Sequence, residues 1–220
     1  MNSDSISDII SGIYAITDPN LLTSQTALLD AVDAALAQGV RVIQYRDKLA
    51  SSDQKLERAK AIHRLCKRYQ AVSIINDSLE LMIAADADGV HLGQTDGATA
   101  LTELDIPKQK IIGVTCHDDI ELAIRAQQHG ASYAAFGRFY PSNTKPHAKP
   151  AKIETLIEAK QELSIPVVAI GGINAHNMSP LLDAGADCIA VINAIFGQND
   201  TQKAANTLVS TFNRLTAGFN

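Results

Sequence analysis

One local pattern recurs along the chain. A segment with helical spacing of apolar residues ends in a small or acidic residue and a glycine, and a short run of β-branched residues follows. The pattern occurs at residues 37–43, 85–92, 128–133 and 183–189. Three of its glycines stand where the C-terminus of a helix requires φ > 0: Gly39, Gly130 and Gly185. Helices and strands that alternate in this way are typical of a parallel sheet.

Along the whole chain the pattern predicts strands near residues 13–17, 40–45, 71–76, 88–92, 110–114, 132–137, 166–170 and 187–192. It predicts helices near residues 25–38, 53–69, 78–86, 97–104, 118–129, 151–162, 176–184 and 200–216, with start signals such as Asp118 followed by Glu121. Eight strand–helix units in 220 residues predict a single-domain α/β fold, the (β/α)8 or TIM barrel, with residues 1–11 as a short N-terminal extension. An open, doubly wound parallel sheet is the alternative.

Composition limits the partners of such a domain. The chain has 19 basic and 24 acidic residues, a net charge of −5, which argues against a nucleic-acid or anionic membrane surface. Its apolar runs are shorter than the roughly 18 residues that a membrane span needs. The three cysteines fall singly, which fits a reducing cytoplasm; we expect Cys66 and Cys188 in the core and leave Cys116 open. We expect small-molecule ligands and leave open a homo-oligomer.

The second predicted strand ends in the polar run Gln44-Tyr-Arg-Asp-Lys48. Because side chains alternate along a strand, Gln44, Arg46 and Lys48 share one face, which continues the face of Val40 and Val42. If these valines point into the barrel, an amide and two cations project over its mouth, where an anion would justify their desolvation. The alternative is an ordinary solvated turn.

Acidic residues follow the third and fourth predicted strands. Asp77 and Asp96 stand at these strand ends, which are neighbours in a barrel, so the two carboxylates could share one divalent cation. Mg²⁺ takes one or two carboxylates and completes its shell with water and phosphate oxygens. The pair therefore predicts a Mg²⁺–diphosphate seat. The alternative makes Asp77 a helix cap, with Glu80 completing a capping box, and Asp96 the cap of the next helix.

The later strand ends add further polar groups. Thr115 and His117 follow the fifth strand and offer a hydroxyl and an imidazole at the mouth. After the sixth strand, a proline-rich loop carries a group that suits closure over phosphate: Ser142, Asn143, Thr144 and Lys145. An ordinary solvated loop is the alternative there. Gly171 and Gly172 after the seventh strand, with Asn193 after the eighth, favour a monophosphate site built from backbone N–H groups, although paired glycines also simply turn a chain.

Several motifs in this order resemble the thiamine-phosphate synthase (thiamine-phosphate pyrophosphorylase) family. The resemblance covers nearly the whole chain through Tyr14-Ala-Ile-Thr17, Gln44-Tyr-Arg-Asp-Lys48, Ile75-Asn-Asp77, Gly89-Val-His-Leu-Gly-Gln-Thr-Asp96, Gly113-Val-Thr-Cys-His117, Tyr140-Pro-Ser-Asn-Thr-Lys145 and Ala169-Ile-Gly-Gly-Ile173. It implies a TIM-barrel transferase that joins 4-amino-5-hydroxymethyl-2-methylpyrimidine diphosphate to 4-methyl-5-(2-phosphooxyethyl)thiazole with Mg²⁺. In that family the diphosphate is described as leaving before the thiazole nitrogen attacks.

The resemblance also implies roles for individual residues. The pyrimidine diphosphate would be held by Gln44, Arg46, Lys48 and Asn76. The Mg²⁺ would be held by Asp77 and Asp96, and the departing diphosphate by Lys145. The thiazole phosphate would be held by Ser142, Thr144, Gly172, Ile192 and Asn193. Catalysis would then fall to charge and hydrogen bonds from Arg46, Lys48, Thr115 and Lys145.

The sequence departs from the family pattern at four positions. Thr115 stands where many members carry Ser, Ser142 where many carry Thr, Asn193 where many carry Ser, and Arg138 where Pro is common. The hydroxyl exchanges keep a donor, whereas Asn193 changes the geometry of its side chain. Two alternative functions stay open. A thiazole tautomerase of this fold would use His117 as its proton shuttle, and a phosphate-ligand sensor would bind without turnover.

Overall fold

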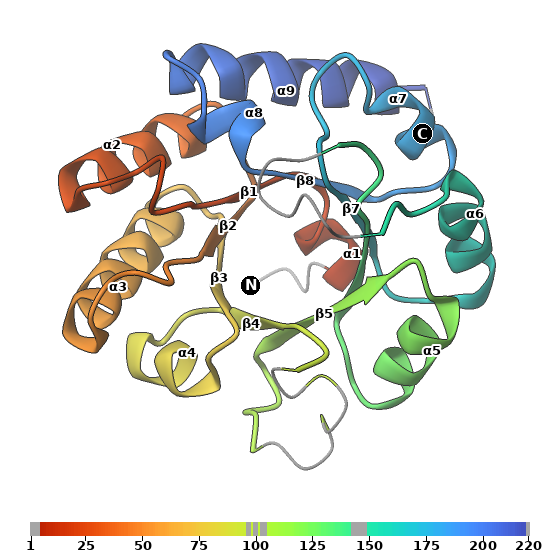
Figure 1. The fold of residues 1–220 in the computed structure, drawn as a ribbon, viewed down its shortest axis with the longest axis horizontal. Helices are drawn as coiled ribbons and strands as arrows, with labels where there is room; N and C mark the ends of the chain where they lie inside the picture. Colours follow the sequence, from red (N-terminus) through yellow and green to blue (C-terminus); the bar gives the residue numbers. More distant parts are fainter. Residues whose placement is uncertain (1–4, 96–97, 99–100, 102–104, 142–148, 219–220) are drawn as a thin grey trace.

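The computed structural model describes residues 5–95, 98, 101, 105–141 and 149–218. Its strands form one closed parallel barrel in the sequential order β1-β2-β3-β4-β5-β6-β7-β8 (Figure 1). The strands are β1 (Gly12–Ile16), β2 (Val42–Tyr45), β3 (Val72–Asn76), β4 (Gly89–Leu92), β5 (Ile111–His117), β6 (Tyr133–Phe136), β7 (Val167–Ile170) and β8 (Cys188–Val191). The predicted TIM barrel is confirmed and the open sheet is wrong, because β8 pairs with β1.

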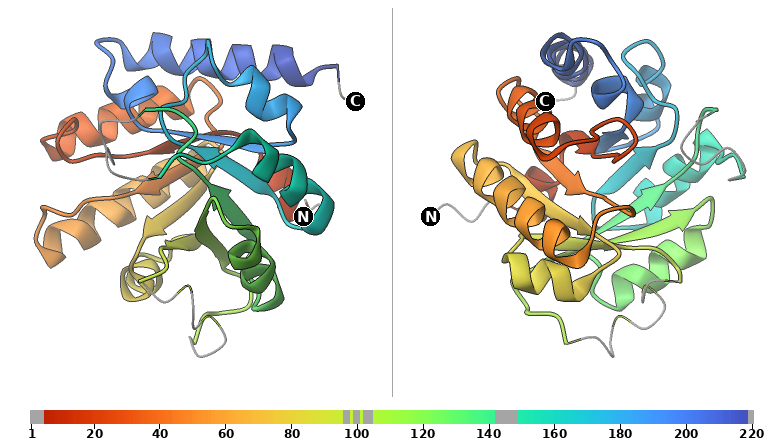
Figure 2. Two further views of the ribbon diagram at one scale, coloured as in Figure 1. Left: turned by 45° about the vertical axis from the view of Figure 1, so that its right-hand side comes forward. Right: turned by 60° about the vertical axis from the view of Figure 1, so that its left-hand side comes forward.

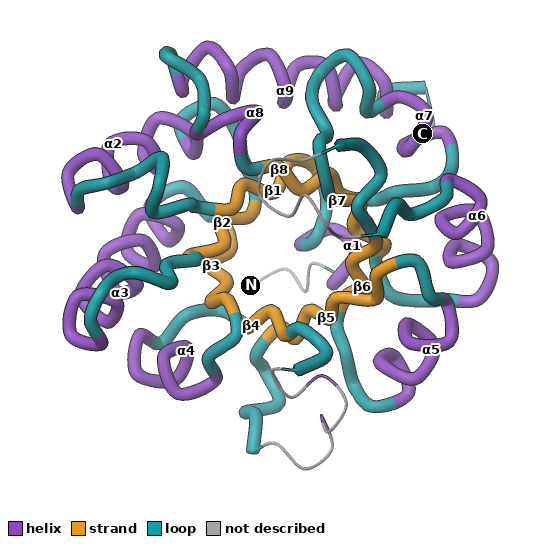
Figure 3. Tube along the Cα trace, in the orientation of Figure 1, coloured by secondary structure: helices purple, strands orange, loops and turns teal. Residues whose placement is uncertain are grey.

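Helices lie outside the ring of strands (Figure 3). They are α2 (Gln25–Leu36), α3 (Ser52–Arg68), α4 (Leu79–Ala85), α5 (Ile120–Gln128), α6 (Ile153–Glu162), α7 (Ser179–Asp183) and α9 (Thr201–Thr216). Two short helices were not predicted: α1 (Ile6–Ile9) and α8 (Asn193–Phe196). The helix predicted at 97–104 falls mostly outside the described residues. The glycines predicted to end helices have the expected positive φ, at 91° for Gly39, 94° for Gly130 and 101° for Gly185.

Short polar side chains begin most of the long helices. Caps that accept a backbone N–H at the third helical position are Ser24, Ser51, Ser78, Asp119 and Asp200. The start predicted at Asp118 is therefore wrong, because Asp119 caps α5. The carboxylate of Asp118 instead accepts hydrogen bonds from the Lys152 N–H at 2.9 Å and the Thr155 hydroxyl at 2.6 Å. It thus anchors the start of α6 against the end of β5.

The apolar core has two layers that the barrel wall separates. Inside the barrel lie Tyr14, Ile16, Val42, Ile74, Ile111, Tyr133, Ala135, Val168, Cys188 and Ala190. Between the barrel and the helices lie the residues that alternate with them, such as Ile43, Ile75 and Val90. Val42 points inward as expected, whereas Val40 precedes β2 and packs in the outer layer. Parity along β2 therefore holds from Val42 onward, and it places Gln44 in the interior.

Side chains join neighbouring strands at the end of the barrel where the strands begin. Three residues that precede even-numbered strands accept an N–H from the strand before: Asp88 from Ser73 at 2.9 Å, Ser132 from Ile112 at 3.0 Å and Asp187 from Val167 at 2.8 Å. We call Asp88, Ser132 and Asp187 the lower clamps. Two of them also bind a lysine of an outer helix, Asp88 with Lys67 of α3 at 2.8 Å and Asp187 with Lys160 of α6 at 2.9 Å.

The short helix α1 closes this same end of the barrel. Ser5 and Asp8 form a capping box that holds the helix. Ile10, which follows it, is fully buried against the interior layer. In the right-hand view of Figure 2, α1 lies at the end of the barrel away from the loop that follows β6. The predicted N-terminal extension is thus a plug over the described residues 5–11, and the opposite end remains for a site.

Two further expectations concern the environment of the chain. Within the described ranges, no helix combines the length and the apolar character that crossing a membrane requires. All three cysteines are free and buried, so Cys66 and Cys188 lie in the core as expected, and Cys116 does too. Burial raises the pKa of the Cys66 and Cys116 thiols to about 12. These thiols therefore stay protonated and act as core side chains.

Candidate active site

The loop after β2 carries two cations, Arg46 and Lys48, with Asp47 between them. The Asp47 carboxylate accepts the N–H groups of Leu49 and Ala50 at 2.9 Å each and binds Arg58 at 2.7 Å. Burial raises the pKa of Asp47, but these donors outweigh burial and the pKa is lowered overall. An ionised Asp47 thus fixes the loop that carries Arg46 and Lys48.

Arg46 is held through its backbone. Thr17, at the end of β1, accepts the Arg46 N–H at 2.9 Å and donates its hydroxyl to the Arg46 carbonyl at 3.2 Å. The Arg46 side chain is half-buried, whereas Lys48 is exposed. The loop that carries these two cations is therefore tied to β1 through Thr17, and the projection of both side chains over the barrel mouth stays a prediction.

Asp77 does not cap the helix that follows it. Ser78 is the N-cap of α4: its hydroxyl accepts the Leu81 N–H and donates to Glu80. The capping interpretation of Asp77 is therefore wrong. Asp77 itself has a left-handed backbone, with φ of 65°, a conformation that Asp tolerates better than most residues. Its N–H donates to the His91 carbonyl at 2.9 Å, which ties the end of β3 to β4.

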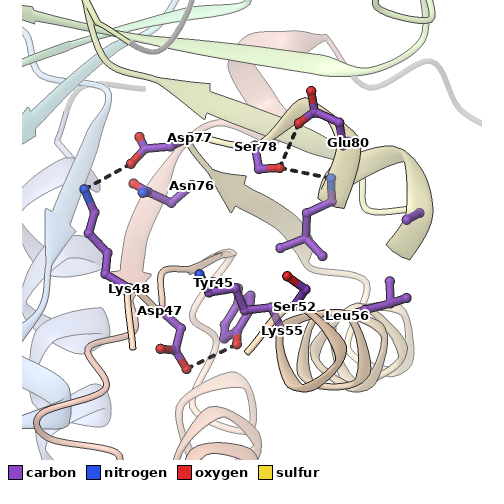
Figure 4. Close-up of a pocket in the computed structure, with 12 residues that line it drawn as sticks. Tyr45, Asp47, Lys48, Ser52, Lys55, Leu56, Asn76, Asp77, Ser78 and Glu80 are labelled. Atoms are coloured by element: carbon purple, nitrogen blue, oxygen red, sulfur yellow. Dashed lines mark hydrogen bonds and ion pairs between the residues drawn. The ribbon is translucent and has the colours of Figure 1, made fainter. Parts of the chain in front are cut away.

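The freed carboxylate of Asp77 meets Lys48. The Lys48 Nζ lies 3.3 Å from the Asp77 Oδ2, and in Figure 4 the two side chains point toward each other with Asn76 beside them. The Lys48 side chain is 63% exposed and that of Asp77 28% exposed. An ion pair this open contributes about 0–1 kcal/mol to stability. Folding alone therefore gives little reason for placing these two charges together.

A cavity of about 470 Å³ adjoins this ion pair, between the loops that follow β2 and β3 (Figure 4). Of the residues predicted to form the site, it is lined by Lys48, Asn76 and Asp77. The cavity also reaches the first turns of α3 and α4 through Ser52 and Ser78. It extends to one side of the mouth, whereas Gln44, Thr115 and Gly172 belong to the barrel interior and to the later loops.

Inside the mouth, polar side chains form a continuous chain of hydrogen bonds. Gln44 donates its Nε2 to the Tyr14 hydroxyl at 2.7 Å, and the Tyr14 and Tyr133 hydroxyls lie 2.8 Å apart. The Tyr133 hydroxyl lies 3.0 Å from the His91 Nδ1, and the His91 Nε2 lies 2.8 Å from the Thr115 Oγ1. We call these five residues the interior chain. Sequence reasoning found its two ends, Gln44 and Thr115, and missed the middle.

The two tyrosines of the interior chain are fully buried, Tyr14 at 1% and Tyr133 at 0% exposure. Burial raises the pKa of both phenols well above their ordinary value. They are therefore neutral at physiological pH, and each hydroxyl carries one proton that it can donate. Period-two alternation along β1 and β6 was the signal that would have revealed them, since it places a phenol on the inward face of each strand.

The paired glycines after β7 receive another segment of backbone. Tyr140 donates its N–H to the Gly171 carbonyl at 3.0 Å, and a Cβ at Gly172 would fall on the Pro141 carbonyl. Gly171 and Gly172 have φ of 106° and 66°. The glycines thus let the loop after β6 lie directly on the loop after β7. They do more than turn the chain, the simpler alternative.

The end of β8 supplies the neighbouring group of residues. Ile192 is the N-cap residue of α8 and is partly buried, and Asn193 is its first helical residue and is exposed. Because β7 and β8 are adjacent in the barrel, these residues stand beside the loop that carries Gly172. The predicted monophosphate residues that the structure describes therefore belong to adjoining loops.

The remaining predicted residues lie outside the described ranges, at the end of β5 or in the loop after β6. Asp96, Ser142, Asn143, Thr144 and Lys145 lie outside the described residues. His117 is exposed at the end of β5 with φ of 54°. Arg138 donates from Nη1 to the Tyr140 carbonyl at 3.4 Å, within the loop after β6. Gln94, which sequence reasoning did not single out, donates to the Thr115 carbonyl and ties the loop after β4 to β5.

The described residues can be tested for a metal seat. Among them, no group of three or more His, Cys, Asp or Glu side chains is placed to hold a metal ion. Asp77 offers one carboxylate at the mouth, partly exposed and paired with an exposed lysine that can move away. Mg²⁺ commonly uses one or two protein carboxylates and takes its other ligands from water and phosphate. The donor chemistry around Asp77 fits such an ion and does not fit a closed cage of protein ligands.

A closed parallel barrel with cations, an acid and a polar chain at the carboxyl ends of its strands has the architecture of TIM-barrel enzymes, whose active sites lie at this end. A family model described as thiamine monophosphate synthase matches residues 13–195. The chain belongs to the thiamine monophosphate synthase family.

Individual relatives agree with this assignment. A protein of Alcanivorax borkumensis named thiamine-phosphate synthase is 48% identical over 204 residues, covering 91% of this chain and 94% of that protein. One of the same name from Saccharophagus degradans is 45% identical over 197 residues, covering 90% and 91%. The solved structure of thiamine phosphate pyrophosphorylase from Pyrococcus furiosus is 33% identical, covers 93% of this chain and 96% of its own, and superposes with a TM-score of 0.83.

Proposed function

We propose that this chain makes thiamine phosphate at the barrel mouth in a Mg²⁺-dependent reaction. It transfers the 4-amino-2-methylpyrimidin-5-ylmethyl group from its diphosphate to 4-methyl-5-(2-phosphooxyethyl)thiazole. Family membership and the names of relatives that match nearly the whole chain support the transfer. The observation that carries the site is the 3.3 Å ion pair of Lys48 and Asp77, because it places a cation, which suits phosphate, beside a carboxylate, which suits Mg²⁺. We place the activity in the cytoplasm, where free thiols persist.

The reaction mainly needs stabilisation of a leaving anion. The bond between the pyrimidine methylene and the diphosphate oxygen breaks, and its electron pair leaves with the diphosphate. The thiazole nitrogen then forms the new bond to the methylene carbon with its lone pair. Arg46 and Lys48 would supply positive charge to the diphosphate at the mouth, and Lys145 would add a third cation. Charges positioned in advance in this way lower the barrier without a protein nucleophile.

Asp77 and Asp96 would hold the Mg²⁺. When bound, the ion would neutralise charge on the diphosphate. Asp77 is supported by its position: its left-handed backbone and Ser78 as the helix cap leave its carboxylate directed to the mouth. Its partner Lys48 balances that carboxylate and is exposed enough to turn toward a phosphate instead. Asn76, half-buried beside Asp77, would contact the pyrimidine diphosphate together with Gln44 and Thr115.

The second substrate would lie across the mouth. Its phosphate would be bound by Gly172 and by Ile192 and Asn193, on adjoining loops after β7 and β8, and by Ser142 and Thr144. Gly172 is exposed, which would let a phosphate reach its backbone, while the loop after β6 fills the space that a Cβ would take. The two anion seats would thus stand on opposite sides of the barrel axis, with the pyrimidine ring above the interior chain.

One experiment tests this function directly. Purified protein is mixed with both substrates, with and without Mg²⁺, and thiamine phosphate is measured by mass spectrometry. We expect product only with Mg²⁺, and none from a variant carrying both Asp77→Asn and Asp96→Asn. Circular dichroism establishes that the variant is folded. Absence of product from folded wild-type protein with intact substrates would overturn the proposal. Product formed without any divalent ion would contradict the proposed dependence on Mg²⁺.

A further inference from the structure

We infer that Tyr14, Tyr133 and His91 are positioning residues: through the interior chain they set which hydrogen-bonding groups Gln44 and Thr115 present to the pyrimidine diphosphate. The three residues lie below the mouth and act through the residues at the two ends of the chain. The inference rests on the proposed function, since it takes Gln44 and Thr115 as contacts of that substrate.

The interior chain crosses the barrel from one wall to the other. Tyr14 belongs to β1 and Tyr133 to β6, strands that do not pair with each other, yet their hydroxyls lie 2.8 Å apart. From there the chain passes to β4 through His91 and to β5 through Thr115. The aromatic rings of these residues also pack against one another. The His91 ring stacks on the Tyr133 ring with 5.6 Å between their centroids, and the Tyr14 ring meets the Tyr133 ring edge to face with 6.1 Å between centroids.

The protons of the interior chain run in one direction. Gln44 donates from Nε2 to the Tyr14 oxygen, and we infer that Tyr14 gives its single proton to Tyr133. Tyr133 then gives its own proton to the His91 Nδ1, which must be the acceptor. A neutral His91 therefore carries its proton on Nε2 and donates it to Thr115. Each link uses one proton, and the hydroxyl proton of Thr115 is left for a ligand.

This direction gives the two ends opposite character. Gln44 uses its amide nitrogen inside the barrel, so its Oε1 is the group that accepts a hydrogen bond from a ligand. Thr115 accepts from His91 and therefore donates to a ligand. The pyrimidine diphosphate offers a match for both, with a 4-amino group that donates and ring nitrogen and diphosphate oxygens that accept. The interior chain thus favours a substrate with a donor near β2 and an acceptor near β5.

Packing holds the middle of the interior chain in place. A Cβ at Gly113 would fall on the Tyr133 phenol, so the glycine provides the space that the ring occupies. Tyr14 and Tyr133 are fully buried, and each of their hydroxyls has two hydrogen-bond partners within the protein. A buried polar network with every member bonded specifies one arrangement of its groups.

The first test observes the proton of His91 without any substrate. Two-dimensional ¹H–¹⁵N spectra of protein labelled at histidine report the tautomer of each ring, and the His91 signal is assigned by its loss in a His91→Gln variant. We expect the tautomer with the proton on Nε2. A proton on Nδ1, or on both nitrogens, would reverse or break the direction of the interior chain and overturn the inference, whatever the protein catalyses.

The second test compares the pyrimidine diphosphate with its analogue that carries hydrogen in place of the 4-amino group. In Tyr14→Phe and Tyr133→Phe we expect kcat/KM for the natural substrate to fall about tenfold, the loss of one buried hydrogen bond. We expect little change for the analogue, which makes no bond to Gln44. Tyr69→Phe, in the outer layer, is the matched control and should change neither value.

The outcomes separate the inference from the proposed function. Equal losses for both substrates would give the tyrosines a purely structural role and overturn the inference. Unchanged values in both folded variants would do the same. If one tyrosine variant fails to fold, the other still decides. Absence of turnover in wild-type protein would overturn the proposed function, and the tautomer of His91 would still decide whether the interior chain has the direction described.

Discussion

The phenol of Tyr133 occupies the space that a side chain at Gly113 would fill. Gly113 lies on β5 and Tyr133 on β6, and the two are direct partners in the parallel ladder. The glycine therefore sets the position of a hydroxyl on which four other polar residues depend. A small residue on one strand thus determines how a large residue on the next strand reaches the barrel axis.

Gly113→Ala should destabilise the protein by about 1–3 kcal/mol, because an added methyl overpacks a closed interior. It should also lower kcat/KM for the pyrimidine diphosphate, because Tyr133 must shift away from Tyr14 and His91. Urea unfolding and steady-state kinetics measure the two effects. Gly218→Ala, with open space around it, is the control and should leave both unchanged. A wild-type unfolding midpoint for Gly113→Ala would show that the Tyr133 ring can move freely.

Asp88→Asn should lower the free energy of unfolding by about 1–3 kcal/mol at pH 7. The half-buried Asp88 carboxylate accepts two hydrogen bonds from Ser73 and pairs with Lys67, and the substitution weakens these contacts. Urea denaturation is the measurement. Asp86→Asn is the control, since the Asp86 side chain is 87% exposed and asparagine tolerates its left-handed backbone. Equal unfolding midpoints for wild type and Asp88→Asn would contradict the role of this lower clamp.

The same Asp88 variant has a defined pH dependence. Burial raises the pKa of Asp88, but Lys67 and Ser73 lower it by more, so the folded-state pKa lies below its ordinary value. A lowered pKa stabilises the fold above the unfolded-state value of about 4, and this contribution is lost as the pH falls through the folded-state value. The stability difference between wild type and variant should therefore shrink in strong acid. A difference that stays constant from neutral pH to pH 2 would contradict this account.

Asp77→Asn should raise the Mg²⁺ concentration for half-maximal turnover by at least tenfold, since even outer-shell changes weaken metal sites by about 10–100-fold. Unfolding should change little, because its ion pair with Lys48 is exposed. Turnover is measured across a Mg²⁺ titration. Glu158→Gln, exposed on α6, controls for the loss of one negative charge. An unchanged titration would remove Asp77 from the metal seat.

Gly172→Ala should raise KM for the thiazole phosphate about tenfold and leave KM for the pyrimidine diphosphate within about twofold. A left-handed backbone with φ of 66° costs a residue other than glycine about 1–2 kcal/mol, and the new methyl would meet Pro141. The second substrate is thus the internal control for the first. Parallel changes in both KM values would show that the whole mouth shifts and that Gly172 serves no separate phosphate seat.

Much of the fold was predictable because it rests on local signals. Helices that end at glycines with positive φ, followed by short apolar strands, gave the barrel and most element positions. The helices α1 and α8 were missed because four residues barely exceed one turn, too few to show a period. The cap at α5 was misplaced by one residue because Asp118 and Asp119 are adjacent carboxylates, and only the packing of α6 selects between them.

The candidate site was predictable at the strand ends and less so below them. Alternation along β2 placed Gln44 on the inward face, as the structure has it, whereas Arg46 and Lys48 follow the end of the strand at Tyr45. The link between Tyr14 and Tyr133 joins residues 119 positions apart, and no spacing rule connects them. A histidine or tyrosine among apolar neighbours looks like an ordinary core residue until the closed barrel brings several together.

The lower clamps fasten the strands of the barrel wall in pairs. Asp88 joins β3 to β4, Ser132 joins β5 to β6 and Asp187 joins β7 to β8. Each of these three pairs therefore has a side-chain hydrogen bond of its own. At the remaining pair, Arg41 precedes β2 and reaches the Asp8 carbonyl of α1 at 3.2 Å. The N-terminal plug therefore takes the place of a lower clamp at β1 and β2, and we expect amide hydrogen exchange in these two strands to follow the opening of α1.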